Sequence, residues 1–152
     1  MKIKVRRAKK SDFERVFDLI KELAHFEKLK PPSRAAKKRL FNDAFNKNPL
    51  YFILVSELGK NITGYAFYFF TYSSFLARKT LYLEDIYVTQ NVRSKGTGQA
   101  FFKELLKIAQ KEKCGRMEWC VLDWNKNAIK FYDKLGAKPL QDWIYYRLTL
   151  NS

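Results

Sequence analysis

The stretch that most constrains this 152-residue chain is residues 81–102, LYLEDIYVTQNVRSKGTGQAFF. Residues 81–88 are rich in β-branched and aromatic side chains, which favours a strand. From Gly98 onward the apolar residues recur at helical spacing, which predicts a helix directly after a glycine-bearing loop. Such a loop is an anion site, because the first helical amides lack intrahelical acceptors and the helix dipole is positive there. Gly96 and Gly98 let phosphate oxygens approach the backbone, so the stretch predicts a ligand that carries phosphate or pyrophosphate.

The loop motif itself, R-x-x-G-x-G at residues 93–98, is short. A tight strand-to-helix turn without any ligand is the alternative interpretation. The chain contains neither the G-x-x-x-x-G-K-[ST] phosphate loop nor the full G-x-G-x-x-G dinucleotide fingerprint. The loop motif alone therefore does not identify the ligand.

Length and composition indicate one globular domain, residues 1–152, because 47% of the residues are hydrophobic and the chain can bury a sizeable core. No apolar run approaches the roughly 20 residues that cross a bilayer, and no continuous apolar segment follows the basic N-terminus, so we expect neither a membrane span nor a signal peptide. Cys114 and Cys120 show no metal-ligand or redox spacing, and the chain has one histidine. We therefore expect no metal and a cytoplasmic location.

The net charge of +15 implies anionic partners without naming them. Nucleic acid, an acidic membrane surface and a polyphosphate cofactor all fit this charge. A solvated lysine-rich surface also fits it, because the lysines are spread along the whole chain.

Hydrophobic periodicity predicts the element order βααββ–βαβαβ, a mixed α/β sandwich. Two helices follow the first strand, one starting at a Ser11–Glu14 capping box and the other capped by Ser33. Strands 51–57 and 62–72 form an antiparallel hairpin, and strands 81–88 and 117–122 are parallel neighbours because a helix separates them. A helix capped by Asn125 and a final strand at residues 143–150 complete the chain.

With its motifs on this order of elements, the sequence resembles the GNAT superfamily of N-acetyltransferases over nearly the whole chain. Its two cofactor motifs are matched by the R-x-x-G-x-G loop and by Trp124-Asn125 through Phe131-Tyr132. The resemblance implies the GNAT fold, a central and mostly antiparallel sheet with one parallel pair at its fourth and fifth strands and helices on both faces. Within the superfamily the chain looks most like the diamine acetyltransferases, the spermidine/spermine and thialysine branch, on residues 19–24, 82–85 and 136–137.

The resemblance implies transfer of an acetyl group from acetyl-CoA to a primary amine, without a metal. It implies that the loop holds the pyrophosphate and that the fourth strand and the last helix line the pantetheine arm. The residues it assigns to cofactor binding are Ile86, Tyr87, Val88, Arg93, Ser94, Lys95, Gly96, Thr97, Gly98, Gln99, Asn125, Ala128 and Tyr132. A free amide of Tyr87 or Val88 is expected to polarise the thioester carbonyl.

Tyr132 matches the position of the superfamily's tyrosine acid. A phenol is protonated at neutral pH and can therefore protonate a departing thiolate. Glu84 matches the position through which this branch removes a proton from the amine, with water between them. The hydrophobic periodicity also agrees with two interpretations that involve no catalysis. Tyr132 can pack beside Phe131 on the apolar face of its helix, and Glu84 can be an exposed polar residue of its strand.

The resemblance assigns substrate contacts to Phe26, Glu27, Glu84 and Asp85. A carboxylate cluster of this kind attracts a polyamine even on a basic protein, because local charge decides within a cleft. Strand alternation places Glu84 and Asp85 on opposite faces unless a bulge intervenes. Ile144 stands where the polyamine enzymes carry an acidic residue, which leaves shorter diamines, thialysine-like amino acids and peptide amines open.

Three alternatives remain at this point. The acceptor can be a protein N-terminus or lysine, the chain can be a basic nucleic-acid-binding domain without activity, or Cys120 can carry an acetyl intermediate. No helix-in-groove or aromatic RNA-platform motif supports nucleic-acid binding, and a cysteine in an apolar strand is usually structural. The diamine branch also implies a homodimer.

Overall fold

A computed structural model describes residues 2–150 of the chain. The chain forms two compact units, which divide between Trp119 and Cys120. The first unit contains the β-sheet, and the second contains the last helix.

The first unit is built on a five-stranded sheet in the order β1-β2-β3-β4-β5. Its strands are β1 (Ile3–Arg7), β2 (Phe52–Leu58), β3 (Asn61–Ser73), β4 (Arg78–Val88) and β5 (Arg116–Trp119). The first four pair antiparallel and β4 pairs with β5 in parallel. The predicted mixed sheet with one parallel pair is confirmed.

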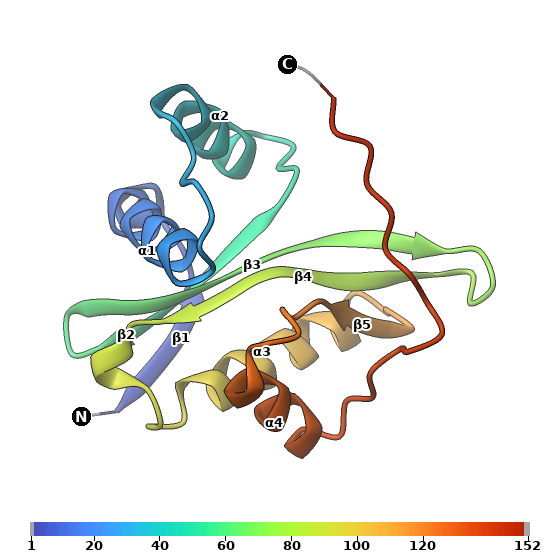
Figure 1. Ribbon diagram of the computed structural model, residues 1–152. Coiled ribbons are helices and arrows are strands. Elements are labelled where there is room, and N and C mark those ends of the chain that lie inside the picture. The colour runs from blue at the N-terminus through green and yellow to red at the C-terminus, as the bar shows by residue number, and fades with distance from the viewer. Residues whose placement is uncertain (1, 151–152) are drawn as a thin grey trace. The chain divides into compact units, whose positions relative to one another are not determined.

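Helices cover both faces of this sheet, as Figure 1 shows. The helices α1 (Phe13–Phe26) and α2 (Arg34–Phe45) lie on one face, and α3 (Thr97–Lys111) lies on the other. Short 3₁₀ turns, η1 (Lys10–Asp12) and η2 (Gln90–Val92), precede α1 and the loop before α3. The layered arrangement follows from amphipathic helices that bury their apolar stripes against a sheet.

The starts of α1 and α2 differ from each other in their capping. Ser33 caps α2 as predicted, since its Oγ accepts from the Ala36 amide at 3.1 Å. The predicted Ser11–Glu14 box at α1 is wrong, because Asp12 is the N-cap and its carboxylate instead accepts from the Lys9 amide at 2.7 Å. Asp12 also pairs with Arg6 on β1, and this contact competes successfully with local capping.

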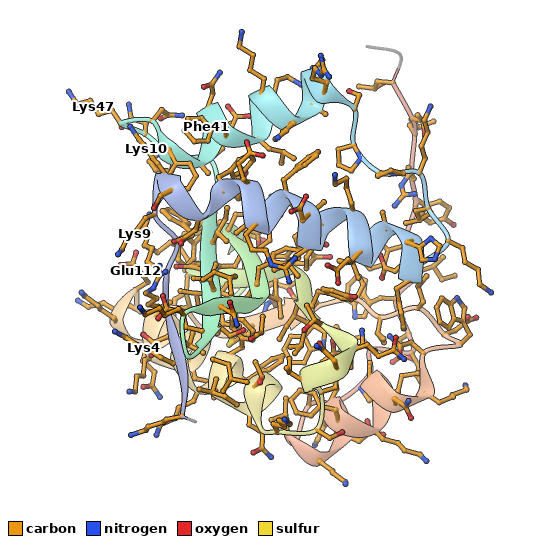
Figure 2. The ribbon with its side chains drawn as sticks, turned by 90° about the vertical axis from the view of Figure 1, so that its left-hand side faces the viewer. Lys4, Lys9, Lys10, Phe41, Lys47 and Glu112 are labelled. Atoms are coloured by element: carbon orange, nitrogen blue, oxygen red, sulfur yellow. The ribbon has the colours of Figure 1, made fainter. Side chains whose placement is uncertain are left out.

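Large apolar side chains fill the space between each face of the sheet and its helices. On the α1 and α2 side, Phe13 meets Phe41 edge-on at 5.3 Å between ring centroids, and Phe41 projects from α2 in Figure 2. The buried residues of this cluster are Phe13, Val16, Phe17, Leu19, Ile20, Ala44, Tyr51, Ile53, Val55, Tyr65 and Tyr87. On the α3 side, Phe101, Phe102 and Leu105 are buried.

The strand β4 changes its pairing halfway along its length. Its pairing with β5 ends at Leu83↔Trp119, while its pairing with β3 continues to Gly64↔Val88. At the same point Tyr68 pairs with Leu83 but Phe67 pairs with Asp85, so Glu84 is the extra residue of a β-bulge. The second half of β4 therefore has one edge that no strand covers among the described residues.

The second unit contains the helix α4 (Lys126–Lys134). Asn125 caps it as predicted, accepting from the Ala128 amide at 3.3 Å, and Gly136 follows its end at a φ of 89°. The predicted strand at residues 143–150 is wrong, since the structure has no strand there, and the predicted strand 117–122 ends at Trp119. A strand needs backbone partners along a neighbouring edge, and the structure assigns no strand pairing to residues 143–150.

Candidate active site

The loop before α3 presents backbone amides to solvent. Ser94 and Gly96 have φ angles of 64° and 85°, and no side chain caps α3. A Cβ built on Gly96 meets no atom within 4 Å, so the space over this residue is open. An uncapped helix N-terminus below an open glycine fits a pyrophosphate. The exposed residues Arg93, Ser94, Lys95 and Gly96 and the helical Thr97, Gly98 and Gln99, all predicted cofactor contacts, are contiguous here.

Arg93 makes contacts that the loop motif did not indicate. Its Nε donates to the Val88 carbonyl at 2.9 Å, and its guanidinium carbon lies 5.3 Å from the ring centroids of both Phe26 and Tyr87. Cation–π contacts of this kind order a flexible side chain. Arg93 therefore ties the loop to the end of α1, next to two predicted site residues.

The uncovered edge of β4 determines which amide is free. The Thr89 amide donates to the Thr63 carbonyl of β3 at 2.8 Å. Because successive amides of a strand point in opposite directions, the Tyr87 amide also faces β3 while those of Ile86 and Val88 face the uncovered edge. Of the two predicted donors to the thioester carbonyl, the geometry favours Val88 over Tyr87.

The bulge brings three carboxylates into one electrostatic neighbourhood. Asp85 faces the same side of the sheet as Tyr65 and Tyr87, and Glu27 follows the last turn of α1. Glu84 and Glu27 both act on Asp85, and Glu84 acts on Glu27. None of the three forms an ion pair with any residue of the described range, although the chain carries a net charge of +15. We call Glu27, Glu84 and Asp85 the acidic cluster.

The acidic cluster is tuned by burial and mutual repulsion. Burial, followed by the repulsion from Glu84 and Glu27, raises the pKa of Asp85 to about 6, although a hydrogen bond from Tyr65 opposes this shift. Burial also raises the pKa of Glu27, with the charge on Glu84 adding to the effect. A positively charged ligand would relieve this repulsion.

The second unit holds the remaining three predicted residues. The side-chain oxygen of Asn125 is engaged in capping α4 at the Ala128 amide. Tyr132 lies on α4, where its ring meets that of Phe131 edge-on at 5.7 Å between centroids. This contact agrees with the packing interpretation of Tyr132 and leaves its catalytic role a prediction.

Several contacts beside the acidic cluster had no signal in the sequence. Tyr65 is fully buried and its hydroxyl donates to Asp85 Oδ2 at 3.0 Å. The Tyr87 hydroxyl donates to Glu22 Oε1 at 3.1 Å, and Arg15 pairs with Glu22 at 3.4 Å. These contacts depend on cross-strand register and helix placement, which no local motif encodes.

The basic residues are largely solvated. Lys4, Lys9, Lys10 and Lys47 are exposed and project outward in Figure 2. Among the described residues, no group of three His, Cys, Asp or Glu side chains is placed so that it could hold a metal ion, and no helix is long and apolar enough to cross a membrane.

Residues 13–137 match the acetyltransferase (GNAT) family. The chain therefore belongs to the acetyltransferase (GNAT) family and is an acetyl-CoA-dependent N-acetyltransferase. Of the two classes that composition left open, an enzyme and a nucleic-acid-binding domain without activity, the family match supports the enzyme.

Particular relatives are similar over most of the chain. The chain is 36% identical to the thialysine N-epsilon-acetyltransferase of Mus musculus, over 95% of this chain and 91% of that protein. It is 36% identical to the spermidine/spermine N(1)-acetyltransferase-like protein 1 of Homo sapiens, over 95% of this chain and 22% of that longer protein. An integron cassette protein from V. cholerae shares the fold, with a TM-score of 0.80 at 24% identity over 99% of this chain and 94% of that chain.

Gly96→Ala is expected to weaken acetyl-CoA binding by about tenfold, because the new Cβ occupies the open space where phosphate oxygens approach. Isothermal titration calorimetry with acetyl-CoA measures the change. The positive φ alone should lower the free energy of unfolding by roughly 1–2 kcal/mol.

Gly136→Ala is the matched control, since Gly136 has a φ of 89° and a Cβ added there also meets no atom within 4 Å. It should lose similar stability with unchanged acetyl-CoA affinity. Equal loss of acetyl-CoA affinity in both variants would contradict a phosphate site at Gly96.

Proposed function

We propose that this enzyme acetylates a small amine that carries two positive charges, a short diamine or a thialysine-like amino acid. The observation that carries the proposal is the acidic cluster, which has no ion pair with any of the described residues of a strongly basic chain. A second ammonium group on the substrate supplies that partner and relieves the repulsion among the carboxylates. A monoamine leaves the cluster without compensation once its amine has lost its proton.

The amine must lose a proton before it attacks. An alkylammonium has a pKa of about 10.4, so little of the neutral form is present at pH 7. Glu84 stands at the bulge, exposed and next to Asp85, and we assign it to accept this proton through water. The other carboxylates, Glu27 and Asp85, bind the distal charge, with Phe26 beside Glu27 as an apolar contact.

The chain's own groups also hold acetyl-CoA in this proposal. The amides of Ser94–Gln99 bind the pyrophosphate, with Arg93 and Lys95 as basic neighbours, and Ile86, Tyr87 and Val88 lie along the pantetheine arm. The Val88 amide at the uncovered edge of β4 stabilises the negative charge that develops on the thioester oxygen. Asn125 and Ala128 line the arm, and Tyr132 donates a proton to the departing thiolate.

The relatives support this substrate class. One acts on thialysine by its name and another is named for spermidine and spermine. Ile144 replaces an acidic position of the polyamine enzymes, which favours the shorter substrates. Protein N-termini and lysines are the second candidate acceptors, because acidic peptides suit the basic surface.

An assay of free thiol release from acetyl-CoA tests the proposal against spermidine, spermine, putrescine, thialysine, lysine and N-terminal peptides. We expect turnover with thialysine or putrescine, and Glu27→Gln should raise the KM for that amine by about tenfold because one attractive charge is lost. Asp18→Asn is the matched control, since Asp18 is an exposed residue of α1 paired with Lys21, and should leave the KM unchanged. Turnover with peptides alone would contradict the diamine assignment.

Tyr132→Phe is expected to lower kcat by about tenfold or more, because the thiolate then leaves without a proton donor. The Kd for acetyl-CoA should change little, since a single hydroxyl is removed. Steady-state kinetics with the best amine measures kcat. Turnover at the wild-type rate would remove Tyr132 from the mechanism.

We further infer that residues 1–152 act as one catalytic domain and that two copies associate. The family match at residues 13–137 spans both compact units. The described surface includes exposed apolar side chains on the β3–β4 hairpin, where Phe75 is 99% exposed. Within the second unit, the exposed fractions of Trp143, Ile144, Tyr145, Tyr146, Leu148 and Leu150 range from 75% to 93%. Apolar surface of this extent favours burial against a partner.

Sedimentation velocity at micromolar concentration is expected to show a dimer. Phe75→Ser should shift the equilibrium toward monomer, because it removes an apolar side chain from the contact surface. A wild-type chain that sediments as a monomer throughout would contradict the homodimer.

A further inference from the structure

The hydrogen bond between Tyr65 and Asp85 connects the core of the sheet with the acidic cluster. Tyr65 lies in the middle of β3 and none of its surface is exposed, whereas Asp85 is partly buried beside the bulge of β4. The Tyr65 hydroxyl donates to Asp85 Oδ2 at 3.0 Å. Tyr65 pairs with Tyr87 in the strand register, so its ring is held by β4 as well as by the core cluster.

The bulge makes this contact possible. Tyr82 pairs with Phe69, and simple alternation from Tyr82 would turn Asp85 to the face that α3 covers. The extra residue Glu84 shifts the alternation, and Asp85 pairs with Phe67 on the face of Tyr65. The carboxylate therefore meets a phenol whose position is determined by the core.

All the neighbouring charges that act on Asp85 disfavour its ionised form. Glu84 on β4 and Glu27 after α1 repel it, and burial removes water from it. Tyr87, also on β4, donates its hydroxyl to Glu22 of α1, and Arg93 lies over the Tyr87 ring and donates to the Val88 carbonyl. Among the described residues, the Tyr65 hydroxyl is the one group that favours the charged form of Asp85, since it hydrogen-bonds the carboxylate.

We infer that Tyr65 is a positioning residue of the amine site, whose hydroxyl orients Asp85 and keeps its carboxylate charged so that the free oxygen can receive an ammonium group. The inference rests on the proposed acetylation of a dicationic amine and adds a residue that acts through Asp85 without touching the substrate. Its consequence is that the protonation of Asp85, with a pKa raised to about 6, depends on a side chain of the core.

The experiment is a titration of the Asp85 side-chain carboxyl by ¹³C NMR, assigned with Asp85→Asn, in the wild type and in Tyr65→Phe. Loss of the hydroxyl should raise the Asp85 pKa by about one unit or more, because a hydrogen bond that favours the anion is gone. Protonation of Asp85 should raise the KM for the amine. The midpoint pH of this rise in KM should therefore increase by the same amount as the Asp85 pKa. Tyr68→Phe is the matched control, since Tyr68 is a buried tyrosine of β3 that pairs with Leu83 on the other face, and it should move neither value.

An unchanged Asp85 pKa in folded Tyr65→Phe, or a loss of activity equal at every pH, would overturn the inference. If Tyr65→Phe does not fold, the Tyr65 ¹³Cζ resonance of the wild type replaces it. That resonance should shift as Asp85 titrates, and a Tyr65 resonance that does not respond would overturn the inference. A shifted Asp85 pKa without acetylation of any amine in the panel would support the Tyr65–Asp85 link while refuting the proposed substrate class.

Discussion

The pairing of β4 is the constraint on which the site in the first unit depends. One half of the strand is bonded on both sides, and the other half is bonded to β3 alone. The change occurs at the bulge, so the same few residues mark the start of the uncovered edge and turn Asp85 toward α1. The bulge turns Asp85 because an extra residue in one strand shifts the alternation of the side chains that follow, and the edge is uncovered because β5 ends at Trp119.

The charge of the site is opposite to that of the molecule. A chain with a net charge of +15 places three carboxylates within electrostatic reach of one another, and none of them has an ion pair among residues 2–150. Such an arrangement costs stability, since burial and like charges both oppose ionisation. A cost of this kind is typical of functional sites, where the ligand provides the compensating charge. In the proposed function, the basic loop at α3 binds the anionic cosubstrate in the same way, with amides and lysine in place of carboxylates.

Arg93 connects these two regions within the first unit. It begins the glycine loop, yet its guanidinium lies over Phe26 and Tyr87 and donates to the Val88 carbonyl. The residue was predicted as a cofactor contact from its motif alone. Its contacts in the structure indicate that it also holds the end of α1 against β4, where the acidic cluster lies.

The sequence by itself determined the order of elements from β1 to α4, the parallel pairing of β4 and β5, the Ser33 and Asn125 caps and the glycine loop, because each depends on local propensity or on a connection of fixed hand. It also brought Glu27, Glu84 and Asp85 together, through a family resemblance. Only the tertiary structure decided that Asp85 faces Tyr65, that Val88 has the free amide, that Asp12 replaces Ser11 at α1, and that residues 143–150 form no strand. These features depend on register and on partners distant in the chain, and a strand or a buried carboxylate is stable only when such partners are present.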